Sequence, residues 1–320
     1  MAKQNKNTIY LIVLIALIGF YLLFKFVIKP APDSNFDLNA LSVDTSRVAA
    51  ITIKQPSKKA IKLSQIGEKW NVSQADKTAE ADIRAVKGIH SVLADMKIQN
   101  IAATSPDKWK EFHLTDSLAT EVQLFDKSGK IIKDFYLGKF SYKQNKNPYE
   151  RSYGNNVTGL TYVRLAGKNE SFIVNGFLPM SFTREFNSFR NQTVLHLNKN
   201  DIDKIVFDYP ADTGFVVSKK DSLGWFVNNT DSVDRSKVSQ YLNSISTIRE
   251  SNFDDSFKPA NKAKYTITYS GKNISDITVK VYQKDSANYI LNSSQNPKTF
   301  FESSSKNVKR LMQSAKYFKK

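Results

Sequence analysis

The sequence contains no cysteine, which excludes disulfide bonds and thiolate metal sites. Histidine is also scarce: none of His90, His113 and His196 has a second histidine or a cysteine three or four positions away. Metal-binding pairs on a helix use that spacing, so we expect no metal site. We interpret each histidine as structural or exposed.

Catalytic motifs are missing as well. The chain has no nucleophile elbow, no Walker A loop and no Rossmann glycine pattern. Asp254 and Asp255 are adjacent carboxylates of the kind that a glycosidase places around one bond, but the pattern favours an exposed loop pair. We therefore predict a protein that is not an enzyme and has no catalytic residues and no cofactor. An enzyme with two convergent carboxylates is the third alternative.

Long apolar runs are limited to one stretch, residues 8–28, with the sequence TIYLIVLIALIGFYLLFKFVI. A helix rises by about 1.5 Å per residue, so this stretch is long enough to cross a hydrocarbon core of about 30 Å. Lys25 lies near its end and can reach the interface. No small-residue cleavage site follows, which disfavours a cleaved secretory signal. We expect a transmembrane anchor over residues 1–29 and a linker over residues 30–42.

The orientation of that anchor is only weakly indicated, because lysines lie on both sides of the expected span. The segment before the span is short and the body after it is large. This favours a cytoplasmic N-terminus and an exported body.

Acidic residues are outnumbered, and the formal net charge is +17 at pH 7. Such a chain is attracted to lipid headgroups, lipopolysaccharide, acidic polymers or an acidic partner. Its lysines are scattered, arginine is scarce, and no helical pattern carries a basic face with interleaved aromatic residues. We therefore expect no nucleic acid as a partner, and a lysine-coated surface without a ligand is the plainer interpretation.

Beyond the linker, the hydrophobic pattern predicts an ordered series of elements. Alternation of apolar and polar residues predicts strands at residues 48–55, 60–66 and 69–73. The spacing then becomes helical in EADIRAVKGIHSVLADMKI, and the helix begins at Asp82. Residues 121–138 and 161–176 are typical of two β-hairpins.

The same series recurs in the second half of the chain. Predicted strands at residues 202–210 and 214–221 are followed by GWFV, a helix over residues 234–251 and two more hairpins. The sequence therefore predicts an α+β fold of two tandem, duplicated domains, residues 43–197 and 198–320. Each is expected to be an antiparallel sheet with a covering helix.

Two matched tryptophans mark the repeat. Trp70 and Trp225 are each followed by a valine two residues later and then by the predicted helix. An aromatic residue that returns with the fold is better explained as structural core than as a ligand platform. We expect Trp70→Ala to unfold the first domain rather than to remove a binding activity.

A further helix is predicted where the first domain ends. Phe182, Phe186 and Phe189 lie at helical spacing, which indicates one helix that bridges into the second domain. Its counterpart is expected at the C-terminus, with apolar residues on one face at Val308, Leu311, Met312 and Ala315.

One segment of the first copy has no equivalent in the second. The connection at residues 138–159, GKFSYKQNKNPYERSYGNNVTG, is much longer than its counterpart and mixes aromatic and basic residues. Tyrosine and arginine anchor interfaces well, and long loops are often functional; a loop with no partner is the alternative. The candidate partner-binding residues are Phe140, Tyr142, Lys143, Lys146, Tyr149, Arg151 and Tyr153.

Several of these features together resemble a known family. The WNV motif, FYLGK, and above all FRNQTVLHLNKNDIDKI at residues 189–205 are similar to the bacterial domain-of-unknown-function family 4340. The likeness covers nearly all of the chain after the expected span and contains no catalytic signature. Residues 138–159 look longer than the usual family connection.

The resemblance implies a cell-envelope protein, because members are often encoded beside ABC transporters of the gliding-motility type. It implies a single-pass protein of the bacterial inner membrane with a periplasmic body. We expect a non-enzymatic accessory subunit or partner-binding scaffold, whose partner is an ABC-type permease and ATPase complex or another envelope protein. The alternative is a binding module for an anionic envelope polymer, peptidoglycan or lipopolysaccharide.

Overall fold

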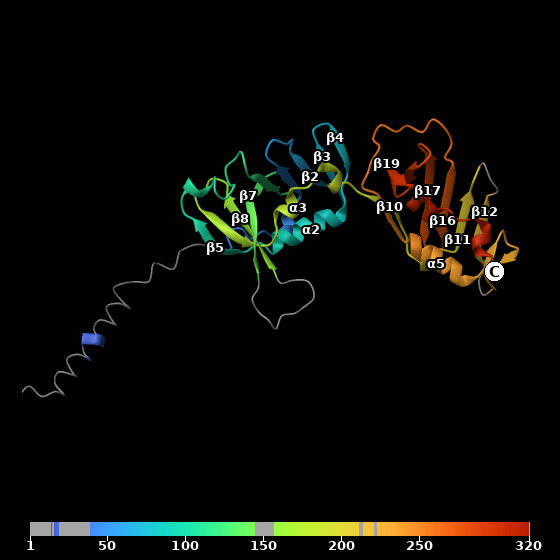
Figure 1. Cartoon of the computed structure of the whole chain (residues 1–320), viewed down its shortest axis with the longest axis horizontal. Coiled ribbons are helices and arrows are strands. Elements are labelled where there is room, and N and C mark those ends of the chain that lie inside the picture. Colours follow the sequence, from blue (N-terminus) through green and yellow to red (C-terminus); the bar gives the residue numbers. More distant parts are fainter. Residues whose placement is uncertain are drawn as a thin grey trace, which may run out of the picture.

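The computed structural model describes residues 14, 16–18, 39–144, 157–210, 214–220 and 223–319 (Figure 1). Antiparallel sheet dominates and the helices are few, so the predicted α+β class is confirmed. The α-helices among the described residues after residue 38 are α2 (Ile83–Ala94), α3 (Pro179–Phe182), α4 (Phe186–Phe189), α5 (Arg235–Ile245), α6 (Ser305–Leu311) and α7 (Ala315–Phe318).

The first large sheet has its strands in the order β4-β3-β2-β1-β6-β7-β8-β9-β5. Together with α2, α3 and α4 it forms the first unit. The strands are β1 (Ala50–Lys54), β2 (Ile61–Ile66), β3 (Lys69–Gln74), β4 (Lys77–Glu80), β5 (Ile98–Ala103), β6 (Thr120–Phe125), β7 (Ile131–Gln144), β8 (Val157–Leu165) and β9 (Ser171–Asn175).

The second large sheet has the order β14-β13-β12-β11-β16-β17-β18-β19, and with α5, α6 and α7 it forms the second unit. A separate two-stranded sheet pairs β10 with β15. The strands are β10 (Thr193–His196), β11 (Lys204–Asp208), β12 (Phe215–Lys220), β13 (Gly224–Val227), β14 (Asp231–Ser232), β15 (Thr247–Arg249), β16 (Tyr265–Gly271), β17 (Ile274–Gln283), β18 (Asn288–Ser293) and β19 (Asn296–Ser304).

The two large sheets share one strand order from β4 to β9 and from β14 to β19. They form two separate lobes along the chain, with α2 against the first and α5 against the second (Figure 1). The two units differ after the long helix. In the first unit β5 pairs at the edge of the large sheet, whereas in the second unit β15 is outside the large sheet and pairs with β10.

Each long helix begins at an aspartate that caps it. The Asp82 carboxylate accepts a hydrogen bond from the Arg84 amide at 3.0 Å, and that of Asp234 accepts one from the Ser236 amide at 2.8 Å. Such N-caps satisfy amides that have no partner within the helix. Helix α2 ends at Ala94, earlier than the apolar spacing indicated. The residues buried by the two helices are Val86, Ile89, Leu93, Val238, Tyr241, Leu242 and Ile245.

The backbone around each helix start is the same in both units. The amides of Ala81 and Val233 donate to the carbonyls of Trp70 and Trp225, at 2.8 and 3.0 Å. The following aspartate amides donate to carbonyls of the last short helix of each unit. These bonds join Asp82 to Phe189 at 2.7 Å and Asp234 to Phe318 at 3.2 Å.

The single bridging helix predicted across Phe182, Phe186 and Phe189 is wrong. The structure has two short helices, α3 and α4, because the Thr183 hydroxyl bonds back to a carbonyl at the start of α3 and Glu185 is extended. All three phenylalanines are nevertheless buried, because both short helices direct their phenylalanine side chains toward the core. The C-terminal counterpart is divided in the same way into α6 and α7.

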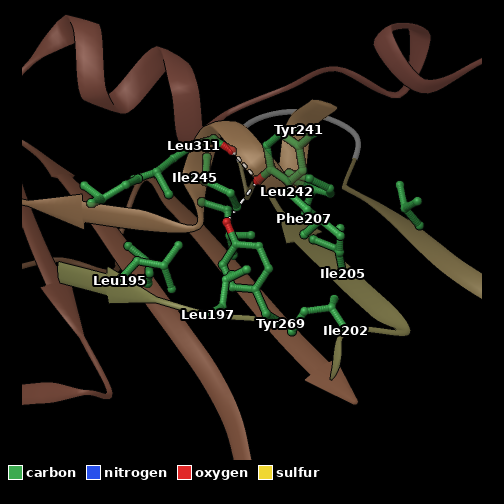
Figure 2. Packing of buried hydrophobic residues seen from close by; sticks show 14 of the residues in the cluster. Leu195, Leu197, Ile202, Ile205, Phe207, Tyr241, Leu242, Ile245, Tyr269 and Leu311 are labelled. Carbon is green, nitrogen blue, oxygen red and sulfur yellow. Dashed lines mark hydrogen bonds between the residues drawn. The ribbon is translucent and has the colours of Figure 1, made fainter. Parts of the chain in front are cut away.

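Each unit has its own hydrophobic core. Described residues of the first cluster end at Phe189 and those of the second begin at Val194. The domain boundary expected between residues 197 and 198 stays a prediction. In the second core Tyr241 and Tyr269 point toward one another among aliphatic side chains (Figure 2).

Two matched turn glycines serve different purposes. Gly129 closes the β6–β7 turn with a φ of +83°, a conformation that glycine adopts without strain. Gly271 instead lies against the chain: a Cβ there would sit 1.6 Å from the Asp201 carbonyl oxygen. The sequence match between these glycines therefore reflects a turn in one unit and close backbone packing in the other.

The predicted membrane anchor lies outside the described residues, except for Leu14 and residues 16–18. Within the part of the chain that the structure describes, no helix has the length and apolar character needed to cross a membrane.

Candidate functional site

Part of the segment singled out at residues 138–159 extends the β7–β8 hairpin. Residues 140–144 of β7 pair with residues 157–161 of β8, and we call this paired portion the hairpin stem. Phe140, Tyr142 and Lys143 belong to the stem. The other predicted binding residues, which lie outside the described residues, are Lys146, Tyr149, Arg151 and Tyr153.

One face of the stem is apolar and exposed. Phe140 and Tyr142 alternate along β7, and Val157 lies opposite Gln144, so the three side chains share a face of the ladder. Their exposed fractions are 49%, 69% and 42%. Lys143 projects from the opposite face. Exposed aromatic residues in one row on a free hairpin are typical of a contact surface.

At two glycines of this hairpin, neighbouring atoms leave no room for a side chain. A Cβ at Gly138 would lie 2.2 Å from the Phe112 carbonyl oxygen, and a Cβ at Gly159 would lie 2.6 Å from the Phe177 ring. Larger residues would push these neighbours away. The Phe177 ring packs edge-on against Phe140, with centroids 5.9 Å apart, which supports the exposed ring from below.

Aromatic stacking continues below the stem. The Phe112 and Tyr162 rings stack with centroids 4.3 Å apart, and the Lys139 ammonium lies 5.4 and 5.3 Å from them. An ammonium over aromatic faces is attracted by the ring quadrupole. Basic and aromatic groups are thus combined at the root of the hairpin as well as along it.

The matching hairpin of the second unit has no stem. Its strands β17 and β18 are joined by a short turn in which the Asp285 carboxylate accepts bonds from the amides of Ala287 and Asn288, at 2.8 and 2.9 Å. The main cause of the lowered pKa of Asp285 is a further bond from the Asn288 side chain, and the two amide bonds add to it. The exposed aromatic row therefore belongs to one unit alone.

The two tryptophans lie among the buried core residues. Trp70 is 7% exposed in the first cluster and Trp225 is 9% exposed in the second. The His90 ring meets the Trp70 ring edge-on, with centroids 5.4 Å apart. Burial lowers the pKa of His90, because the charged imidazolium loses hydration there.

The remaining histidines lie apart from each other. His113 is exposed in a left-handed turn with a φ of +56°. His196 contacts the Thr247 hydroxyl through Nδ1, at 3.2 Å. Among the described residues, no group of three or more His, Cys, Asp or Glu side chains is arranged to hold a metal ion.

Asp254 and Asp255 point to different partners. Asp254 accepts bonds from the Ser256 hydroxyl at 2.7 Å and from Lys284 at 3.0 Å, and the serine bond is the main cause of its lowered pKa. Asp255 instead accepts two bonds from Arg190, at 2.9 and 2.7 Å. The pair therefore acts as a turn cap and an ion-pair partner.

The two units meet at a polar junction that the sequence patterns did not single out. Arg190 follows α4 and is 5% exposed, with its guanidinium 3.8 Å from the centre of the Phe253 ring. Its two bonds to Asp255 connect the end of the first unit to the loop after β15. A forked guanidinium–carboxylate pair fixes geometry as well as charge.

A second ion pair crosses the junction directly. Arg249 of β15 donates from Nη2 to the carboxylate of Asp82, the N-cap of α2, and to Gln192 Oε1 at 3.0 Å. Asn191 lies between the units, because its side chain donates to Glu80 and its carbonyl accepts from Asn296, at 2.9 and 3.0 Å. The only sequence signal for this junction was arginine itself, which is scarce in the chain and appears twice in TREFNSFR.

Comparison with known proteins gives one result. The model of a family described as a domain of unknown function, DUF4340, matches residues 70–269, which run from Trp70 in β3 to Tyr269 in β16. No curated protein and no solved structure matches the chain.

Proposed function

The chain belongs to the family of domain of unknown function DUF4340, and from this premise we propose that it is a non-enzymatic, membrane-anchored scaffold of the bacterial cell envelope. In this role it is an accessory subunit of an ABC-transporter-type membrane complex. The anchor is the apolar run of residues 8–28, and the two units form the periplasmic body.

The hairpin stem carries the proposal. Strand pairing holds Phe140 and Tyr142 in an exposed row, and the Phe177 ring packs against Phe140, so little backbone freedom is lost when a partner covers them. Aromatic anchors of this kind dominate protein interfaces. We assign the stem as the surface that docks on the partner.

We also propose that the two units arose by duplication of one α+β domain. The support is the shared strand order, together with the matched bonds from Ala81 and Val233 to the two tryptophan carbonyls. On this view, the duplicated body is common scaffold, and the stem is what one copy gained.

The test is purification of the full chain in mild detergent, followed by identification of what accompanies it. We expect a multi-span permease and an ATPase to be recovered with the wild-type chain. The double variant F140A/Y142A should lose most of this association while keeping the wild-type melting temperature. Leu223→Ala, which removes a 75% exposed apolar side chain from the second unit, is the control. Recovery of the chain alone would contradict the proposal.

A second candidate is binding of an anionic envelope polymer, peptidoglycan or lipopolysaccharide. The specific observation in its favour is Lys139 above the Phe112–Tyr162 stack, combined with the net charge of +17. Aromatic faces beside an ammonium suit an acidic sugar. A pull-down with isolated cell wall that weakens with salt and with Lys139→Gln would favour this function over the first.

A further inference from the structure

A second surface outside the stem has the features of a ligand site. A cleft of about 510 Å³ lies where α2, the α3–α4 segment and β15 meet at the junction. This volume falls within the range of small-molecule sites, roughly 300–1,000 Å³. Side chains from both units line it, and we call it the junction cleft.

The lining of the junction cleft is strongly basic. Three of its residues are arginines, Arg84, Arg184 and Arg249, and its one acidic residue is Asp82. That carboxylate is already engaged, since it caps α2 through the Arg84 amide at 3.0 Å and pairs with Arg249. The cleft therefore presents an excess of positive charge that no lining group neutralises.

Most donors of these arginines have no partner among the described residues. Arg249 donates only from Nη2. Arg184 uses Nε, which bonds the Met180 carbonyl at 3.1 Å, and within the described ranges the Arg84 side chain makes one polar contact, Nε at 3.6 Å from Asp82. Each guanidinium therefore has N–H groups left to bind an oxyanion.

Small side chains keep the cleft open. Gly88 of α2 lies in its wall, and a Cβ built there has no atom within 4 Å. Ser181 of α3 and Ser188 of α4 also line the cleft and add hydroxyl groups. The arrangement combines space, hydroxyl donors and three guanidinium groups, which is how proteins recognise phosphate.

We propose that the junction cleft binds a phosphomonoester, with its phosphate held by Arg84, Arg184 and Arg249. Guanidinium groups supplied by separate elements suit a tetrahedral anion with several oxygens better than a flat carboxylate. Because Arg249 belongs to the second unit and the other two arginines to the first, the bound phosphate bridges the units and stabilises the junction.

The first test uses the full chain in neutral detergent, with glycerol 3-phosphate and inorganic phosphate as probes. Calorimetric titration is expected to give saturable binding and a raised melting temperature. A Cβ at Gly88 meets no atom within 4 Å, so Gly88→Glu, which adds a carboxylate at the cleft wall, should abolish binding. Arg84→Gln and Arg184→Gln should each weaken it at least about tenfold, because each removes a charge-assisted bond to the phosphate.

Arg235→Gln is the matched control, because it removes an exposed arginine from the start of α5, outside the cleft. It should bind glycerol 3-phosphate like the wild type. Absence of saturable binding, or equal binding by the wild type and Gly88→Glu, would overturn the proposal.

The second test separates a soluble phosphomonoester from a lipid headgroup. Glycerol 3-phosphate and short-chain phosphatidic acid carry the same phosphate, so binding of both that Gly88→Glu abolishes would support the cleft. If phosphatidic acid binds more than about tenfold tighter, the ligand is a lipid; if the two are equal, it is soluble. Binding of either probe that persists in Gly88→Glu would reflect general charge attraction and would contradict the site.

Discussion

The hydroxyl groups of Tyr241 and Tyr269 lie 2.9 Å apart inside the second core, and the Tyr241 hydroxyl also donates to the Leu311 carbonyl at 2.7 Å (Figure 2). Since the carbonyl can only accept, the Tyr269 hydroxyl is the donor to Tyr241. The bonds therefore form a chain from β16 through α5 to the end of α6. This chain ties the covering helix to both the sheet and the C-terminal helix.

Removal of the two hydroxyls is expected to have unequal effects. Tyr241→Phe leaves the Tyr269 hydroxyl and the Leu311 carbonyl without a partner in a dry core, and should lower the free energy of unfolding by about 1–3 kcal/mol. Tyr269→Phe removes only the terminal donor and should cost less, about 0.5–1.5 kcal/mol. Urea denaturation of both variants measures the difference, and equal losses would contradict the inferred direction of the bonds.

The same tyrosines predict a loss of stability at alkaline pH. Burial raises the pKa of Tyr241 and Tyr269, because a phenolate inside the core would lose its hydration. Above about pH 10 the unfolded state releases these protons while the folded state keeps them. The contribution of the two tyrosines to the free energy of unfolding is therefore fully present below about pH 10 and is lost as the pH rises above it. Chemical denaturation across that range should show a steeper loss for the wild type than for Tyr269→Phe.

Local patterns explain why much of the fold was predictable. Alternating strands, the caps at Asp82 and Asp234, and the turn at Gly129 depend on neighbouring residues in the chain, and the sequence displays them directly. The segment with Phe140 and Tyr142 was found differently, by comparing the two copies, as an excess of chain length rich in aromatic residues.

Features that depend on distant partners were missed. The division into α3 and α4 has a local cause, a bond from Thr183 to a carbonyl four residues earlier, but apolar periodicity does not reveal it. The different pairing of β15 depends on which strand edge is nearby, and the junction pair of Asp82 and Arg249 joins residues far apart in sequence. None of these has a signature in the spacing of apolar residues.

The Arg190–Asp255 pair is expected to stabilise the junction. Asp255→Asn keeps the side-chain shape but removes the charge opposite a guanidinium that is almost fully buried. We expect a loss of about 1–3 kcal/mol in the free energy of unfolding, because a buried guanidinium loses its charged partner. Asp76→Asn, at an exposed turn without a partner among the described residues, should be neutral. Similar stability of the two variants would show that the pair contributes little.

The tryptophans provide the test of separate cores. Trp70→Ala opens a large cavity between β3 and the His90 side of α2, and should cost about 3–5 kcal/mol. Because the two clusters have no residue in common, this loss should fall on the first unit, whereas Trp225→Ala should act on the second. Hydrogen exchange followed by peptide analysis resolves the two units.

Tyr142→Ala, an exposed aromatic in the first unit, is the control and should leave protection unchanged. Equal loss of protection in both units from either tryptophan variant would mean that they unfold as one cooperative body.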